Sequence, residues 1–370
     1  GVGGDGVMAS FDEVLKECTK LGTKIPTNEY LKSGKYPVID QGQSDIAGYH
    51  DSDSGLFENV PAIVFGDHTR AVKYVDKPCF LGADGVKLLC PLDKDINCKY
   101  LFYQLSCANI PNTGYNRHFK WVKALNFKIP SSDEQNHVVE VLDKVTELIF
   151  LRKQQRAKLD ELVKARFVEM FGNIIRNDKS WPIHNFSDIA FSRLGKMLDA
   201  KQQTGKYSYP YLANFNVQWF SFNVDNLNQM DFNEAEQKEF ELRDGDLLVC
   251  EGGEIGRCAV WHNEIQPCFF QKALHRVRCN RQLVQPDYLA WWFKYNCNHG
   301  GFAEIAGAKA TIAHLPGIKL KQLQVALPPL SLQNEFAAFV ERVDQQKQTV
   351  QQSLEKLELM KKALMQEYFG

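Results

Sequence analysis

The feature that most constrains this sequence is a long stretch that occurs twice. Ile129–Gly172 recurs as Leu327–Gly370, without a gap and at a constant offset of 198 positions. Identical pairs include Pro130 with Pro328, Gln135 with Gln333, Asn136 with Asn334, Lys158 with Lys356, and the closing Phe171-Gly172 with Phe369-Gly370. A repeat of this length indicates a structural unit, so we expect the same element in both places.

Each copy of the repeat is predicted to form one long helix. Both copies open with proline, which disfavours helix in the residue before it, and from residues 131 and 330 they continue without Pro or Gly to their last residue. A helix over residues 132–170 would be roughly 58 Å long at about 1.5 Å per residue.

The second copy has the apolar spacing of a coiled coil. Its alternating steps of four and three residues place on one stripe Phe336, Val340, Val343, Lys347, Val350, Leu354, Leu357, Lys361, Leu364 and Tyr368. The first copy keeps a seam that we assign to Val138, Val141, Val145, Leu148, Leu159 and Leu162. This seam is lost at Arg152 and Gln155, so the middle of the first helix is polar.

The two apolar stripes predict how the helices are used. The simplest arrangement buries them against each other in an antiparallel coiled coil within one chain. Two alternatives remain open: each helix could pack on its own globular domain, or the chain could dimerise.

Globular segments precede both helices, which predicts an α+β protein with two globular domains of mixed helix and strand, two long helices and a pseudo-two-fold internal repeat. The expected boundaries are 1–7 as a cloning remnant before Met8, 8–128 and 173–326 as globular domains, and 129–172 and 327–370 as helices.

The first globular segment reads as short strands and turns after an amphipathic helix expected over Phe11–Leu21. The expected strands are Pro37–Ile39, Ala62–Gly66, Lys73–Val75 and Val86–Leu89. A helix is expected over Tyr100–Cys107. The polar loop Asp67–Arg70 follows one strand, and the loop Asn112–Trp121 combines basic, amide and aromatic side chains. Such side chains can bond base edges or phosphates and stack on bases, although similar loops are common on ordinary surfaces.

The second globular segment contains weak echoes of the first. The pairs are Phe186–Ile189 with Phe11–Val14, Asp246–Val249 with Ala62–Asp67, Pro267–Phe269 with Pro78–Phe80, and a late helix, Tyr288–Tyr295, with Tyr100–Cys107. The loop Gly307–His314 again precedes the proline that opens a long helix. We therefore expect two related domains that have diverged much more than the helices.

Charge, cysteines and hydropathy exclude several classes of protein. The formal net charge is -1, and residues 1–129 hold 15 basic and 15 acidic residues against 17 and 16 in residues 173–327, so there is no broad basic footprint. The ten cysteines form no CxxC pair or zinc-ligand spacing, which is typical of free thiols in a reducing compartment. No apolar run could span a bilayer, so we expect a cytoplasmic protein without membrane contact.

Catalytic motifs are also missing from the sequence. The glycine-rich stretch Glu251–Arg257 lacks the GxGxxG and GxxxxGK[ST] spacings, and its two carboxylates would repel phosphate, so it is interpreted as a turn between strands. Neither GxSxG nor HExxH is present. The sequence therefore does not favour a standalone nuclease or methyltransferase.

The layout of the chain resembles the specificity subunit of type I restriction-modification systems. The resemblance rests on the repeated helix openings Pro130–Asn136 and Pro328–Asn334 and on the closing Phe-Gly doublets, and it covers essentially the whole chain. Val64–Arg70 with Gly82–Val86 is similar to one type of target recognition domain, and Gly245–Leu248 with Glu251–Arg257 is similar to another.

The resemblance implies a non-catalytic subunit that recognises double-stranded DNA. Each globular segment would be a target recognition domain for one half of an interrupted, asymmetric site, while the helices would set the spacing and bind two methyltransferase subunits. A restriction endonuclease or translocase subunit would join this complex. We expect no cofactor on this chain, because S-adenosylmethionine, ATP and Mg²⁺ would bind the partner subunits. The alternative is a coiled-coil scaffold protein whose globular domains bind protein or other ligands.

Candidate DNA-binding residues are chosen by chemistry from the polar loops, since recognition domains vary most within this family. They are His68, Thr69, Arg70, Asn116, Arg117, His118 and Lys120 in the first domain, and Lys309, Thr311 and His314 in the second. No catalytic or metal-binding residue is expected.

Overall fold

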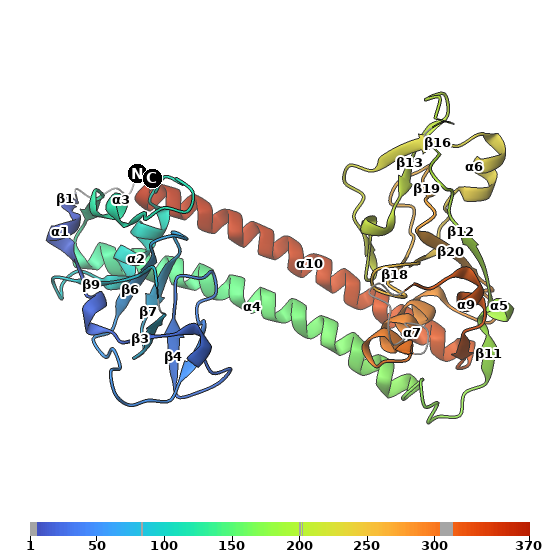
Figure 1. Ribbon diagram of the computed structural model, residues 1–370, viewed down its shortest axis with the longest axis horizontal. Coiled ribbons are helices and arrows are strands. Elements are labelled where there is room, and N and C mark those ends of the chain that lie inside the picture. Colours follow the sequence, from blue (N-terminus) through green and yellow to red (C-terminus); the bar gives the residue numbers. More distant parts are fainter. Residues whose placement is uncertain (1–5, 83, 200, 202, 304–313) are drawn as a thin grey trace. The chain divides into compact units, whose positions relative to one another are not determined.

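The computed structural model of the protein describes residues 6–82, 84–199, 201, 203–303 and 314–370. These residues form two compact units. Unit 1 consists of Gly1–Gln155 with Val350–Gly370, and unit 2 consists of Arg156–Thr349. Each unit combines a globule of short strands and helices with parts of both long helices (Figure 1). The predicted α+β class is confirmed.

Unit 1 contains two four-stranded sheets and a two-stranded ribbon among its described residues. The first sheet has the order β2 (Leu15–Glu17), β9 (Val86–Pro91), β6 (Ala62–Gly66), β7 (Val72–Val75). The second has the order β3 (Lys24–Ile25), β8 (Phe80–Gly82), β4 (Tyr36–Ile39), β5 (Gly48–His50). The ribbon pairs β1 (Val7–Ser10) with β10 (Asn126–Ile129).

The described part of unit 2 repeats this organisation. Its four-stranded sheet has the order β12 (Ala190–Leu194), β20 (Leu274–Cys279), β17 (Leu247–Cys250), β18 (Cys258–Val260). A three-stranded sheet has the order β16 (Asn228–Asp231), β13 (Ser208–Leu212), β19 (Phe269–Phe270). Two ribbons pair β14 (Val217–Gln218) with β15 (Ser221–Phe222), and β11 (Ile183–Asn185) with β21 (Gln324–Ala326).

The two globules share one topology. In each four-stranded sheet an antiparallel hairpin, β6–β7 or β17–β18, lies beside the strand β9 or β20. In each second sheet a parallel pair, β4–β8 or β13–β19, adjoins an antiparallel one. The sequence echoes between the globules are therefore structural, and the strand predicted over Ala62–Gly66 is confirmed.

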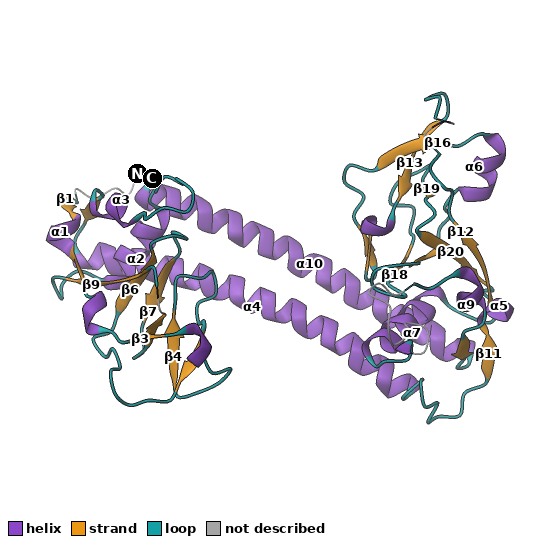
Figure 2. Ribbon diagram, viewed as in Figure 1, coloured by secondary structure: helices purple, strands orange, loops and turns teal. Residues whose placement is uncertain are grey.

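Short helices cover the sheets (Figure 2). They are α1 (Phe11–Val14), α2 (Cys98–Cys107) and α3 (Phe119–Lys123) in unit 1, and α5 (Phe186–Ile189), α6 (Glu234–Phe240), α7 (Pro286–Asn298) and α9 (Gly317–Lys321) in unit 2. The helix predicted over Phe11–Leu21 is wrong beyond Val14. Leu15 starts strand β2, which pairs with β9 in a contact between distant parts of the sequence, so local periodicity could not reveal it.

The repeat forms two uninterrupted helices, α4 (Ser132–Phe171) and α10 (Leu330–Phe369), as predicted. They pack antiparallel in both units. In unit 1, Val145 and Ile149 of α4 contact Leu354 and Leu357 of α10. In unit 2, residues later in α4 contact residues earlier in α10, including the ring pair Phe167–Phe336 at 5.4 Å. The intramolecular helix pair is therefore confirmed.

The seam assigned to the first helix is partly wrong. Leu148 and Leu162 are exposed, and the buried side chains are those of Leu142, Ile149 and Val163. The difference follows from the repeat. The stripe of α10 carried back by 198 positions falls on these three residues together with Val138 and Val145, whereas Leu148 and Leu162 are apolar neighbours on the adjacent face.

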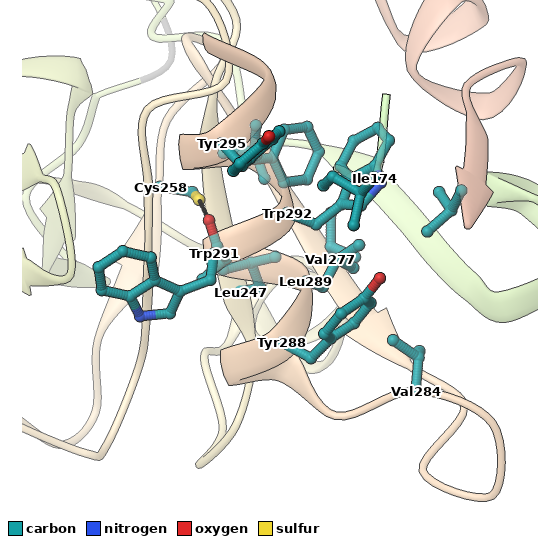
Figure 3. Packing of buried hydrophobic residues seen from close by; sticks show 14 of the residues in the cluster. Ile174, Leu247, Cys258, Val277, Val284, Tyr288, Leu289, Trp291, Trp292 and Tyr295 are labelled. Carbon is teal, nitrogen blue, oxygen red and sulfur yellow. Dashed lines mark hydrogen bonds between the residues drawn. The ribbon is translucent and has the colours of Figure 1, made fainter. Parts of the chain in front are cut away.

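Each globule is joined to the long helices by an apolar core. In unit 2 the aromatic side chains of α7 lie at the centre of this core (Figure 3). Tyr288 packs 4.9 Å from Phe171 of α4, and Trp291 packs 6.1 Å from Phe336 of α10. In unit 1, Tyr100 of α2 packs 5.2 Å from Phe369. Among the described residues, no helix combines the length and apolar character needed to cross a membrane.

Candidate nucleic-acid interface

The hairpin β6–β7 ends in a turn, Asp67–Arg70, whose backbone is held from both sides. The N–H of Asp67 donates to the carbonyl of Gly85 (2.6 Å), and the N–H of Arg70 donates to the carbonyl of Gly66 (2.7 Å). Arg70 has a positive φ of 62° and directs Nη1 to the carbonyl of Ile110 (3.1 Å). The turn, called here the hairpin tip of unit 1, is therefore fixed in shape before any ligand arrives.

A second loop, residues 112–120, is fastened to this hairpin tip by His118. The His118 side chain is completely buried. Its backbone N–H and its Nδ1 donate to the carbonyl of Asp67 at 2.8 and 2.9 Å. Its Nε2 lies 3.3 Å from the N–H of Thr113, which it accepts in the same tautomer. The N–H of Phe119 donates to the Asp67 carboxylate (2.8 Å). His118 therefore organises the loop from inside and has no free face.

The exposed side chains of the 112–120 loop form the candidate surface of unit 1. Tyr115 is 87% exposed and stacks on His68, with ring centroids 4.7 Å apart and planes inclined by 9°. Arg117 and Lys120 are also exposed, and Lys120 Nζ lies 5.2 Å from the ring of Trp121. These groups offer cationic donors and an aromatic face within one short segment, which suits phosphates and bases.

The remaining residues proposed for unit 1 have bonds inside the protein. The Thr69 hydroxyl donates to the carbonyl of Gln41 (2.5 Å), and the Asn116 amide donates to the carbonyl of Thr113. The N–H of His68 donates to Gln41 Oε1 (3.2 Å), while its shielded Nδ1 has no partner among the described residues. Gln41 and Tyr115 were absent from the candidate list. Tyr115 could have been identified as an aromatic residue of the loop. Gln41 lies far from the loop in sequence, so only the fold shows that it contacts the hairpin tip.

In unit 2, too, a later segment of the chain is hydrogen-bonded to the hairpin tip. We call this connection between a hairpin tip and the segment that follows it the clasp. The hairpin β17–β18 ends in Glu251–Arg257, which confirms the predicted turn. The N–H of Leu315 donates to the carbonyl of Glu251 (2.7 Å), and His314 forms a backbone bridge with Gly252. His314 is exposed beside this hairpin tip. Lys309 and Thr311 lie outside the described residues.

The charges at the hairpin tip of unit 2 are largely paired. The Glu254 carboxylate accepts from Trp219 Nε1 (2.7 Å) and lies 4.0 Å from Lys294 Nζ. Arg257 donates to the carbonyl of Asn214 (3.2 Å). Lys294 Nζ also lies 4.2 Å from the Trp219 ring. This tip therefore offers a paired carboxylate beside an aromatic ring, whereas the candidate surface of unit 1 offers the exposed cations Arg117 and Lys120 beside Tyr115.

Buried titratable groups in the described part of the chain serve the core. Burial raises the pKa of the Cys79 and Cys98 thiols to about 12, so both are protonated and unreactive at neutral pH. Burial also lowers the pKa of His275, whose Nε2 donates to the carbonyl of Leu315 (2.9 Å). Among the described residues, no three His, Cys, Asp or Glu side chains come together in a way that could hold a metal ion.

Comparison with known families agrees with this geometry. The family described as the type I restriction modification DNA specificity domain matches residues 10–161 and 179–359. The chain belongs to this family. Each matched specificity domain contains one globule and much of the long helix that follows it.

Two specificity subunits resemble the chain in sequence. The putative type I restriction enzyme MjaX specificity subunit of Methanocaldococcus jannaschii is 23% identical over 195 residues, covering 52% of this chain and 46% of that protein. The putative type I restriction enzyme specificity subunit S.HindORF215P of Haemophilus influenzae is 24% identical over 283 residues, covering 67% and 65%. The chain thus spans about half and about two thirds of these relatives.

A solved structure shares the fold of this specificity-domain protein. The crystal structure of a type I restriction-modification system S subunit from M. genitalium matches with a TM-score of 0.61 and 15% identity, covering 99% of this chain and 96% of that one. The pairing of two globules with two long helices is therefore a fold that this family uses.

Proposed function

We propose that this chain is the DNA-recognition subunit of a type I restriction-modification enzyme, and that each globule recognises one half of an interrupted, asymmetric DNA site. The observation that carries the proposal is the repeated clasp between a hairpin tip and a following loop. One bond recurs in both units, because the backbone N–H of His118 or Leu315 donates to the first carbonyl after the hairpin strand, that of Asp67 or Glu251. The side chains nearby differ: His68, Tyr115 and Arg117 in unit 1, and Glu254 and Trp219 in unit 2. A similar backbone arrangement that carries different side chains suits the recognition of two different half-sites.

The chemistry of the two surfaces supports this assignment. In unit 1, Arg117 could donate to guanine O6 and N7 or to phosphate, and Tyr115 could stack or contact a thymine methyl group. In unit 2, the Glu254 carboxylate could accept from the amino group of cytosine, which a cationic tip could not do. The half-site contacted by unit 2 should therefore differ from that contacted by unit 1.

The repeated helices are proposed to bind two methyltransferase subunits and to set the distance between the half-sites. An endonuclease or translocase subunit would join this complex. In this proposal the chain is not an enzyme and binds no cofactor. S-adenosylmethionine, ATP and Mg²⁺ belong to the partners, and the target adenine is flipped into the methyltransferase. The partners also supply phosphate contacts, since the formal net charge of this chain is only -1. The assembly would act in the cytoplasm, where the chromosome lies.

The test is single-molecule sequencing of DNA from cells that express the neighbouring methyltransferase with or without this chain. The expected result is methylated adenines in one asymmetric, interrupted motif that disappear when the chain is absent. Methylation that is independent of the chain, or confined to a continuous palindrome, would contradict the proposal. The scaffold alternative would then become the leading one.

A further inference from the structure

A buried glutamine ties the start of each long helix to the globule before it. Gln135 and Gln333 occupy the same position in the two copies of the repeat, and only 2% and 0% of their surfaces are exposed. In unit 1, Gln135 Oε1 accepts a hydrogen bond from the backbone N–H of Asn97 (2.9 Å). Its Nε2 donates to the carbonyl of Pro130 (2.9 Å). One amide therefore bonds two separate segments of backbone.

Unit 2 makes the same pair of bonds. Gln333 Oε1 accepts from the backbone N–H of Gln285 (2.9 Å), and its Nε2 donates to the carbonyl of Pro328 (2.8 Å). The same Nε2 also donates to the carbonyl of Leu283 (3.1 Å). The globules have diverged in most side chains, but this connection is kept in both.

The bonded segments link the recognition sheet to the long helix. Asn97 is the N-cap residue of α2, and Gln285 is the N-cap residue of α7. Helix α2 packs on the strand that leads to the hairpin tip, with Leu101 and Leu105 in one core with Ile63 of β6. Helix α7 packs in the same way against β17 and β18. Each glutamine therefore bonds the N-cap of a helix packed on the hairpin strands to the start of a long helix.

The hydrogen bonds of these glutamines can fix the orientation of a globule on its long helix, which apolar packing alone cannot do. Burial of apolar surface is non-directional, so the cores alone would tolerate small rotations of a globule on its helix. Two hydrogen bonds from one buried amide need correct distances and angles on both segments at once. In double-stranded DNA each base-pair step advances about 3.4 Å along the axis, so a small rotation at this junction could move a hairpin tip by one step.

We propose that Gln135 and Gln333 are positioning residues that fix the orientation of each recognition surface on its helix, and thereby the spacer length that the chain accepts. This inference rests on the proposed function. It assigns the selection of spacer length to two junction residues, in addition to the length of the helices.

The experiment compares Gln135→Leu and Gln333→Leu with the unchanged chain, each assembled with the methyltransferase. Substrates are duplexes with both cognate half-sites and spacers that are correct or one or two base pairs shorter or longer. The measured quantity is the ratio of methylation rates on the correct spacer to those on the altered spacers. We expect this ratio to fall by about fivefold to tenfold, a factor at the lower end of what the loss of two hydrogen bonds would give.

Matched variants separate positioning from stability. Gln154→Leu and Gln348→Leu change exposed glutamines on α4 and α10 and should leave the ratio unchanged. Gln135→Met keeps the length and approximate volume of the side chain but loses both hydrogen bonds, so it should give the same fall with less disturbance of the core if the leucine variants fold poorly. Rates that drop equally on every spacer would overturn the inference. An unchanged chain that shows no spacer preference would overturn the proposed function as well.

Discussion

The carbonyl oxygen of Asp67 accepts two hydrogen bonds from one residue, His118, through its backbone N–H at 2.8 Å and its ring Nδ1 at 2.9 Å. The two residues lie on different loops, so this contact holds together the two segments that form the candidate surface of unit 1. It also explains why a histidine chosen as a DNA contact is completely buried.

Replacing His118 with alanine should therefore damage recognition through the shape of the loop. The change leaves the buried Asp67 carbonyl with one fewer donor and opens a cavity, so we expect unit 1 to lose about 2 to 4 kcal/mol of unfolding free energy. Denaturant unfolding measures this loss. The exposed His137 on α4 provides the control, because His137→Ala should change stability by less than about 0.5 kcal/mol. Equal effects of the two substitutions would contradict the proposed clasp.

Replacing Arg117 with alanine should weaken DNA binding without weakening the fold. Arg117 is exposed, and if it contacts a base we expect a loss of about 1 to 3 kcal/mol in binding of the cognate site by the complex with methyltransferase. Preference should relax at one position of the half-site contacted by unit 1 and remain intact in the other half. Binding assays on duplexes with single base changes measure this pattern.

Lys120→Ala is the matched comparison for Arg117. Lys120 is exposed on the same loop, and a phosphate contact there would lower affinity about equally for all sequences and reduce the salt dependence. Unchanged affinity and unchanged sequence preference in Arg117→Ala would remove that residue from the interface.

The sequence predicted the fold best where a pattern was repeated. The constant offset between the two copies placed α4 and α10 almost to the residue, and the paired glutamines were visible in the repeat before their bonds were known. The errors came from contacts between distant segments. Nothing local shows that Leu15 pairs with β9, or that the carbonyl of Asp67 meets His118, because both depend on the folded sheet.

The candidate surface was harder to predict than the fold for a physical reason. Polar loops are chosen from sequence by residue type, but exposure decides which side chains can meet a ligand. Within one loop, His118 is buried and Tyr115 is 87% exposed, although residue type alone makes both suitable for contact with DNA.

Replacing Lys347 with isoleucine should be tolerated, because the repeat places Ile149 at the equivalent position. Lys347 lies on the seam between the helices and donates to Asp160 at 2.8 Å and Asp344 at 3.2 Å. Lys347 is 28% exposed and the two carboxylates are 49% and 48% exposed, so these ion pairs contribute only about 0 to 1 kcal/mol, which apolar packing at the seam should offset. We expect the same or a higher midpoint of thermal unfolding, and a midpoint lowered by several degrees would show that the pair contributes more than packing.

Stability of unit 2 should decrease as the pH falls below neutrality because of His275. Burial lowers the pKa of His275 in the folded protein, while Nε2 donates to the carbonyl of Leu315. The unfolded chain, with a histidine pKa of about 6.5, binds a proton first as the pH falls. The contribution of His275 is therefore complete above about pH 6.5 and is lost as the pH falls towards the folded pKa. Urea unfolding between pH 5 and 8 measures this, and His275→Gln should flatten the curve in that window. Parallel curves for both proteins would show that His275 does not titrate on unfolding.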